Sequence, residues 1–261
     1  MPFVNVEVCV DSVQSALNAC CGGAHRIELC GDLVVGGTTP SLGLVKKVLQ
    51  CTRQWAMQML QPAPQVFAMI RPRAGDFLYS ESEIEVMVED ITAFRDVPVD
   101  GVVFGVLTAE GAVDTKAMQR LMAAAAPLPV TFHRAIDMSC CLLTALETCI
   151  TLGVANVLTS GGESTAEKGA AVLKQLVEKS AGRIAVMAGC GVNASNVAKI
   201  VQQSGVQQVH LSGRIEQDSG MIWRNAAVAM GAADAWEYKI YVCSQSKVRA
   251  VVDTLGHLII S

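Results

Sequence analysis

Apolar and polar positions follow a repeat along most of the chain. Each repeat holds a short apolar run, a loop marked by Gly or Pro, and a stretch of helical periodicity, and it recurs about every 27 residues. The apolar runs predict strands at 4–10, 25–30, 65–71, 100–107, 128–135, 154–160, 183–189 and 206–213. The helical patterns cover Val13–Cys21, Leu42–Leu60, Glu81–Arg95, Thr115–Ala124, Leu142–Leu152, Thr165–Ala181, Asn193–Gln203 and Met221–Met230.

This alternation is typical of βα units, in which crossover helices join parallel strands. Eight units within 261 residues favour a closed (β/α)8 TIM barrel over an open sheet. The predicted α/β domain is a single barrel over residues 4–231, followed by a C-terminal extension over 232–261. Val248, Val251 and Leu255 recur there at helical spacing, so we expect a terminal helix that packs on the barrel or on a neighbouring subunit.

One internal stretch also departs from the repeat. Residues 50–65 lengthen the second helix and its exit loop, and they include Trp55, Met57 and Met59. The stretch is either a surface excursion or an oligomer contact.

Composition limits the function classes. The chain is 51% hydrophobic and 17% charged, which is enough to bury a large core and excludes disorder. A net charge of −4 provides no basic surface for nucleic acid or an anionic membrane. Charged residues and Gly interrupt the apolar runs well short of the ~18 residues that a membrane span needs. We therefore expect a soluble protein with small partners.

Cysteine usage indicates the compartment. The chain starts without a basic segment typical of secretion signals, so a reducing, cytoplasmic location is expected. The ten cysteines form no CxxC motif and are interpreted as free thiols, most of them small buried hydrophobes.

Two strands share a Glu-apolar-Cys pattern. Glu7 and Cys9 lie two residues apart on the first predicted strand, and Glu28 and Cys30 do so on the second. Residues two apart share one face of a strand. If neighbouring strands present these faces in matched order, the thiols of Cys9 and Cys30 face each other.

The carboxyl ends of barrel strands, where barrel enzymes keep their active sites, carry further polar side chains. Glu28, Arg71 and His133, together with Glu7, form a candidate acid/base set for a small substrate. The alternative is structural, because carboxylates and a guanidinium inside a barrel must pair to offset desolvation. Gly189–Gly191 and Ser212–Arg214 fall where many barrels bind phosphate, although such glycines also serve tight turns.

Several ordered motifs carry a resemblance to a known family. They are Glu7-Val8-Cys9-Val10-Asp11-Ser12, Arg26-Ile27-Glu28-Leu29-Cys30, Gly36-Gly37-Thr38-Thr39-Pro40-Ser41, Ile70-Arg71-Pro72-Arg73, Gly75-Asp76-Phe77, Val130-Thr131-Phe132-His133-Arg134-Ala135 and Val157-Leu158-Thr159-Ser160-Gly161. From about Val6 to Gly231, the chain resembles the CutC family of copper homeostasis proteins, and its animal members most. The resemblance implies a (β/α)8 barrel, a cytoplasmic location, a homo-oligomer (dimer or tetramer) and a role in copper handling through binding of Cu(I).

The chain departs from the family pattern at a few positions. Val35 stands before Gly36-Gly37 where Glu is usual, and Ala74 stands where a second glycine tends to follow the Arg-Pro-Arg motif. Cys190 interrupts a run usually made of Gly and Ala, and the residues after His210 also differ. These departures affect the rim of the barrel and leave both cysteines of the strand pair in place.

Elementary chemistry also favours copper at the cysteine pair. Soft Cu(I) prefers thiolates, and two metal–thiolate bonds of about 2.3 Å span roughly the 4.8 Å between neighbouring strands. Together with the resemblance, this makes Cys9 and Cys30 the predicted metal ligands, with His133, His210 or Met69 as a third if their strands direct them to the same place; on the residues alone, interior cysteines without a ligand are favoured. The alternative for both cysteines is an interior position without a ligand.

Two hypotheses from different classes follow. The first is a cytoplasmic Cu(I)-binding protein that uses Cys9 and Cys30. The second is a barrel enzyme acting on a small metabolite, phosphorylated or not, with Glu28, Arg71 and His133 as candidate catalytic residues. An open cavity lined by these side chains favours the enzyme, whereas a mouth plugged by apolar side chains does not.

Overall fold

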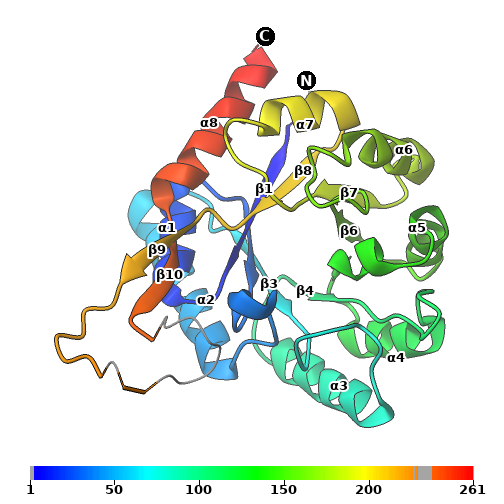
Figure 1. Cartoon of the computed structure of the whole chain (residues 1–261), viewed down its shortest axis with the longest axis horizontal. Coiled ribbons are helices and arrows are strands. Elements are labelled where there is room, and N and C mark those ends of the chain that lie inside the picture. Colours follow the sequence, from blue (N-terminus) through cyan, green and yellow to red (C-terminus); the bar gives the residue numbers. More distant parts are fainter. Residues whose placement is uncertain (1–2, 226, 229–236, 261) are drawn as a thin grey trace.

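Eight parallel strands close into a barrel in chain order, as the repeat predicts (Figure 1). In this computed structural model, the described residues are 3–225, 227–228 and 237–260. The barrel strands are β1 (Asn5–Val10), β2 (Arg26–Leu29), β3 (Gln65–Met69), β4 (Gly101–Phe104), β5 (Val130–Phe132), β6 (Asn156–Thr159), β7 (Ala185–Ala188) and β8 (Gln208–Leu211).

Helices surround the barrel as an outer layer (Figure 1). They are α1 (Val13–Gly22), α2 (Leu42–Met59), α3 (Glu81–Arg95), α4 (Thr115–Ala125), α5 (Leu142–Thr151), α6 (Ala170–Ser180), α7 (Val197–Ser204) and α8 (Gln245–Ile260). Two 3-10 helices lie in loops after strands, η1 (Leu33–Val35) and η2 (Arg134–Met138). No helix in the described ranges is long and apolar enough to cross a membrane.

Local sequence signals account for several helix ends. Ser80 and Glu83 form the reciprocal capping box that starts α3. Gly23 follows α1 with a φ of 92°, a left-handed conformation that glycine adopts without a steric penalty. Helices α6 and α7 begin later than their periodicity predicts, because residues 165–169 and 193–196 form turns.

Strand alternation separates two kinds of interior. Val6, Val8 and Val10 of β1 belong to the main apolar core beneath the helices. Glu7 and Cys9 are the intervening residues of the same strand, so they point into the barrel. The barrel interior can therefore hold polar chemistry while the helix layer contributes apolar packing.

The predicted helix over Met221–Met230 is wrong for the part of this segment that the structure describes. Residues 221–225 and 227–228 are not helical. Ile222 is 99% exposed and Trp223 is 77% exposed, so these apolar side chains have no core to pack against. A helix at this position would need such a core, since most helical stability in proteins comes from tertiary packing.

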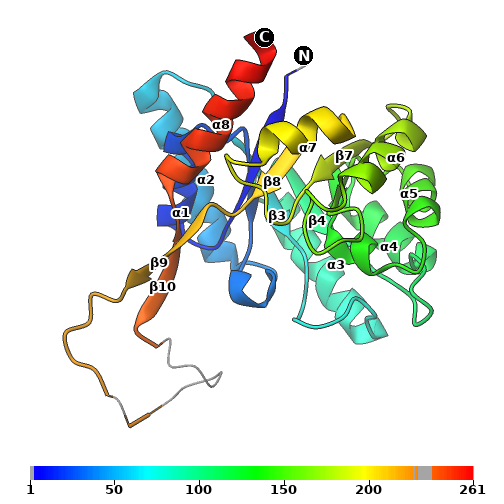
Figure 2. The same cartoon turned by 45° about the horizontal axis from the view of Figure 1, so that its top comes forward.

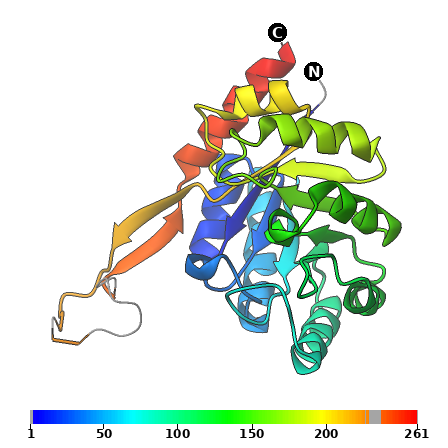
Figure 3. The same ribbon diagram turned by 45° about the vertical axis from the view of Figure 1, so that its right-hand side comes forward.

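An antiparallel hairpin stands between β8 and the last helix instead. It consists of β9 (Arg214–Asp218) and β10 (Lys239–Cys243), and it projects from the barrel as an arm (Figures 1, 2 and 3). The predicted domain boundary between residues 231 and 232 lies outside the described residues.

Helix α8 closes the outer layer by packing between α1 and α7 (Figure 2). Val248, Val251 and Leu255 on its inner face are buried, as their spacing predicts. A Cβ at Gly22 would lie 2.6 Å from the Cβ of Val248, so the missing side chain permits the close approach of α1 and α8.

Candidate functional site

A cavity of about 570 Å³ opens at the carboxyl ends of the barrel strands. This is the end at which barrel enzymes bind their substrates. We call it the mouth cavity, and it is lined by Cys9, Glu28, Leu33, Val35, Gly36, Met69, Arg71, Phe77, His133, Arg134, Asp137, Met138, Leu158, His210, Ser212 and Arg214.

One wall of the mouth cavity, the thiol wall, comes from β1, β2 and β8. The register of β1 with β2 places Cys9 opposite Glu28 and Glu7 opposite Arg26. The register of β1 with β8 places Glu7 opposite His210. One ligand atom each from Cys9, Glu28 and His210 lies within 4.8 Å of the others. Three buried groups that can bind a metal therefore converge at one point.

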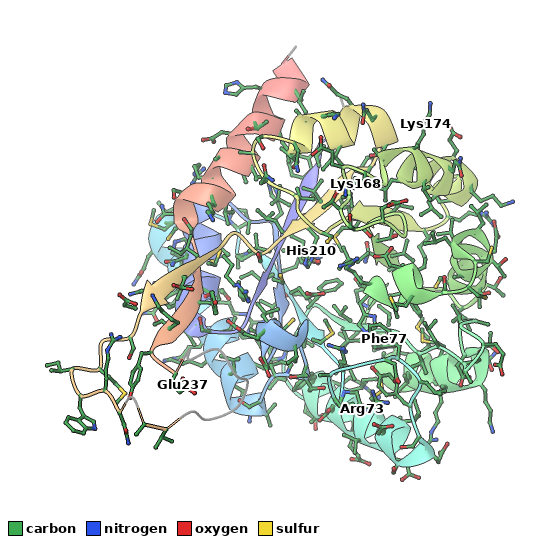
Figure 4. The ribbon with its side chains drawn as sticks, viewed as in Figure 1. Arg73, Phe77, Lys168, Lys174, His210 and Glu237 are labelled. Carbon is green, nitrogen blue, oxygen red and sulfur yellow. The ribbon has the colours of Figure 1, made fainter. Side chains whose placement is uncertain are left out.

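The imidazole of His210 is held from behind by Glu7. Glu7 Oε1 lies 2.7 Å from His210 Nδ1, which leaves Nε2 3.9 Å from Glu28 Oε2. Figure 4 shows His210 near the middle of the barrel. A carboxylate on one ring nitrogen is the usual support of a metal-binding histidine, because it fixes the tautomer and the ring orientation.

Glu7 is itself balanced by a cation. Its second oxygen pairs with the guanidinium of Arg26, and Arg26 also donates to Gln208 Oε1 at 2.7 Å. Burial opposes ionisation of Glu7, but Arg26 and His210 outweigh it and lower the pKa of that carboxyl. Glu7 therefore stays anionic at the barrel floor, where it does not line the mouth cavity.

The surroundings at the thiol wall raise the pKa values of His210 and Glu28. Burial alone disfavours the imidazolium of His210, but Cys9 and the nearby carboxylates raise its pKa well above the ordinary value. Burial is also the main reason that the pKa of Glu28 rises to about 7. Glu28 Oε1 has no hydrogen-bond partner among the described residues, although it is buried.

Cys30 lies outside this group of ligand atoms. Because Cys9 pairs in register with Glu28, Cys30 lies one side-chain layer closer to the mouth. Its thiol donates to Glu28 Oε2 at 3.6 Å and packs with Phe67, Met69 and Val103. Burial raises the pKa of the Cys30 thiol well above its ordinary value. The predicted pairing of Cys9 with Cys30 at a metal stays a prediction.

The opposite wall, the arginine wall, holds Arg71, Phe77 and His133. Arg71 follows β3, and its guanidinium donates to the carbonyls of Val35, Gly37 and Gly75 at 2.9–3.0 Å. The ring of Phe77 lies between the two other groups, 5.1 Å from Arg71 Cζ and 4.8 Å from the centroid of His133.

His133 is neutral at this wall. Its Nδ1 accepts a hydrogen bond from the backbone N–H of Ala135 at 3.2 Å, so the ring proton lies on Nε2. Burial, with a further contribution from the charge of Arg71, lowers the pKa of His133 to about 3. Nε2 has no partner in the part of the chain that is described.

The predicted acid/base set is therefore divided. Glu28, Arg71 and His133 line one cavity, whereas Glu7 lies beneath it as the partner of His210. The sequence predicts His210 only as a third metal ligand. The register of β1 with β8 brings it to Cys9, and no pattern in the sequence reveals that register.

The predicted phosphate loops take only a small part in the cavity. Ser212 and Arg214 line it, but Gly189–Gly191 do not. The glycines also do not open a helix, because α7 begins at Val197. The backbone N–H groups expected to cradle a phosphate there do not face this cavity.

Comparison with known proteins links the chain to one family. The model of the CutC family matches residues 4–215. A human protein and a mouse protein, each named "Copper homeostasis protein cutC homolog", are 50% identical over 247 residues, covering 94% of this chain and 87% of each relative. A solved CutC structure from Streptococcus agalactiae is 32% identical with a TM-score of 0.75, covering 80% of this chain and 99% of the other.

More distant structures share the fold alone. Thiamine phosphate pyrophosphorylase from Pyrococcus furiosus is 16% identical, with a TM-score of 0.59, and the match covers 98% of this chain and 97% of the other. At this identity the likeness carries no inference about activity.

Proposed function

Because this chain belongs to the CutC family of copper homeostasis proteins, we propose that it acts by binding Cu(I) at the thiol wall of the mouth cavity. The observation that carries the proposal is the convergence of Cys9, His210 and Glu28 within 4.8 Å. Cys9 and His210 are the expected ligands, since Cu(I) prefers soft thiolate and accepts imidazole. Glu28, a hard oxygen donor, is a weaker candidate.

The surroundings of the two ligands support this assignment. Glu7 holds His210 Nδ1 and leaves Nε2 directed toward Cys9 and Glu28. Arg26 balances the charge of Glu7, so the support remains anionic when a metal binds. Metal binding displaces the protons of its ligands. Because the pKa of His210 is raised, Cu(I) uptake should release a proton and should become tighter as the pH rises.

A Cys9–Cys30 site is the second ligand set. It keeps the two-thiolate chemistry that Cu(I) prefers. It requires the Cys30 thiol to give up its hydrogen bond to Glu28 and to turn toward the layer of Cys9. The two ligand sets share Cys9 and differ in whether His210 or Cys30 completes the pair.

An anaerobic Cu(I) titration against a competing chelator tests the proposal. We expect about one equivalent to bind the parent protein and Cys9→Ser to abolish tight binding. His210→Asn should weaken binding by at least about tenfold, whereas Cys30→Ser should leave it within about threefold. The opposite order for His210 and Cys30 would establish the two-thiolate set. Cys149→Ser is the matched control, because Cys149 is a buried helix cysteine away from the mouth cavity.

Metal removal provides a second readout. At free Cu(I) one hundred times the Kd, binding should stabilise the fold by about 2.7 kcal/mol. Removing copper with excess chelator should lower the parent's melting temperature and leave that of Cys9→Ser unchanged. If chelation moves both proteins equally, copper does not bind at Cys9.

A barrel enzyme acting on a small metabolite is the second candidate function. Glu28, Arg71 and His133 line an open cavity of about 570 Å³, which is large enough for a small ligand. A carboxyl whose pKa is about 7 is suited to general acid/base work near neutral pH. Turnover of a metabolite that disappears in Glu28→Gln would test this candidate.

We also propose a cytoplasmic location and assembly into a homo-oligomer. All ten cysteines are free thiols, which fits a reducing compartment. Met57, Met59 and Leu60 at the end of α2 are exposed and offer apolar surface for a contact between subunits. Gel filtration with light scattering, on the parent and on a variant with polar residues at these three positions, would test the assembly.

A further inference from the structure

We propose that the arginine wall of the mouth cavity binds the carboxylate of a small organic acid, with His133 Nε2–H as the hydrogen-bond donor and Arg71 as the charge that attracts the anion. This inference names the ligand class of the second candidate function. It does not depend on copper, because the thiol wall contributes none of the groups that it uses.

His133 supplies a donor that the protein leaves unused. The side chain is 4% exposed, and its Nε2 has no hydrogen-bond partner among the described residues. The hydrogen bond from Ala135 N–H to Nδ1 places the ring proton on Nε2. Because the pKa of His133 is low, Nδ1 stays unprotonated and the ring stays neutral. A buried donor without a partner costs free energy, and an oxygen atom of a ligand in the cavity would remove this cost.

Arg71 supplies a charge without a counter-ion. Its side chain is buried, three of its terminal N–H groups donate to the neutral carbonyls of Val35, Gly37 and Gly75, and its Nε has no partner among the described residues. Within the described ranges, no carboxylate lies within ion-pair distance of it. The other buried arginine of the described residues, Arg26, pairs with the carboxylate of Glu7. A buried charge of this kind favours an anion nearby.

The geometry favours a carboxylate over phosphate. Three of the four terminal N–H groups of Arg71 already donate to carbonyls, so the guanidinium acts on a ligand mainly through its charge. Gly189–Gly191, the backbone cradle that a phosphate would use, do not line the cavity. Glu28 does line it, and its carboxylate would repel a dianion more strongly than a single negative charge, whereas the charge of Asp137 is paired with Arg134.

The rest of the cavity suits a short carbon chain. Leu33, Met69 and Leu158 add apolar lining next to the polar groups. A cavity with mostly apolar walls and a few directed polar groups is the usual form of a small-molecule site. The expected ligand is therefore a monocarboxylate with a short apolar or lightly substituted chain.

NMR titration of the full-length protein, with a Cu(I) chelator present, tests the inference. The probes are propionate and pyruvate, with propionamide as the neutral isostere and inorganic phosphate as the competing anion. We expect saturable binding of the carboxylates in about the millimolar range and a shift of the His133 Nε2 resonance. Propionamide and phosphate should bind at least about tenfold more weakly.

Substitutions assign the binding to His133. His133→Leu removes the donor and should weaken propionate binding by at least about tenfold, whereas His133→Gln keeps an N–H donor and should stay within about threefold. His25→Gln is the matched control, because His25 lies before β2 at the opposite end of the barrel and bonds the N–H of Val6. Circular dichroism checks that each variant is folded.

Four outcomes would overturn the inference. Equal binding of propionamide and propionate would show that charge plays no part, and tighter binding of phosphate would show the wrong anion class. Failure of every probe to bind the parent, or unchanged binding in His133→Leu, would show that the wall is not a ligand site. If His133→Leu does not fold, the His133 resonance of the parent still decides between propionate and propionamide. Copper binding in the titration above is unaffected by any of these results.

Discussion

The two walls of the mouth cavity carry the same kind of residue in opposite states. His210 and His133 are both buried at the end of a barrel strand. His210 faces Cys9 and two carboxylates, which raise its pKa, whereas His133 lies near Arg71 and has a pKa of about 3. The difference shows that burial alone does not set the role of a buried histidine. Its charged neighbours decide whether it holds a proton, binds a metal or donates one hydrogen bond.

Arg26, which lies beneath the thiol wall, and Arg71 of the arginine wall provide the largest expected contrast. Arg26→Leu leaves the buried carboxylate of Glu7 without its cation and should lower the free energy of unfolding by about 3–5 kcal/mol. Arg71→Leu leaves only neutral carbonyl groups without a donor and should lower the free energy of unfolding by about 1–3 kcal/mol. Urea unfolding of the metal-free proteins measures both. Equal losses of unfolding free energy in the two variants would mean that leaving Glu7 without its cation costs no more than leaving the carbonyls without a donor.

Acid pH should reveal the neutral state of His133. In the unfolded chain this histidine protonates near pH 6.5, whereas in the folded protein it stays neutral until about pH 3. The stability that it contributes is therefore present above pH 6.5 and is lost as the pH falls toward 3. Between pH 7 and pH 5 the parent should lose about 2 kcal/mol that His133→Gln does not lose. Urea unfolding measures this change. If the free energies of unfolding of the two proteins fall equally between pH 7 and pH 5, the pKa of His133 is not lowered.

Phe77 should give the smallest effect and separate the walls most cleanly. Its ring contacts both Arg71 and His133, and among the described residues no ring contact joins it to the thiol wall (Figure 4 labels Phe77 and His210). Phe77→Leu should lower the free energy of unfolding by about 1 kcal/mol and weaken propionate binding. Cu(I) affinity, measured by the same chelator competition, should not change. A parallel loss of copper binding would show that the two walls act as one site.

The architecture of the barrel could be predicted from the sequence, because periodicity reports on burial. All eight barrel strands and seven of the predicted helices lie where the alternation of apolar and polar residues places them, with small differences at the helix ends. The helix predicted over Met221–Met230 is wrong for the described part of this range, because apolar residues such as Ile222 and Trp223 need not be buried. The same pattern on an exposed segment cannot be told from an amphipathic helix by spacing alone.

The site could be predicted only in part, because it depends on the register between strands. Spacing within one strand shows that Glu7 and Cys9 share a face, and Glu28 and Cys30 likewise. Whether Cys9 lies opposite Cys30 or opposite Glu28 depends on the stagger of closure, which the structure resolves in favour of Glu28. The same stagger brings Glu7 to His210, a residue about two hundred positions away in the chain.

The packing of α8 against α1 has a consequence for synthesis on the ribosome. Contacts of α1 with β10 and α8 join residues 228 positions apart in the chain, namely Ser15 with Cys243 at the end of β10 and Cys21 with Arg249 of α8. The apolar face of α1 that α8 covers therefore emerges early and waits for almost the whole chain to be translated. We expect this face to be a binding site for chaperones on nascent chains, and ribosome-bound chains that end before α8 should crosslink there while complete, released chains should not.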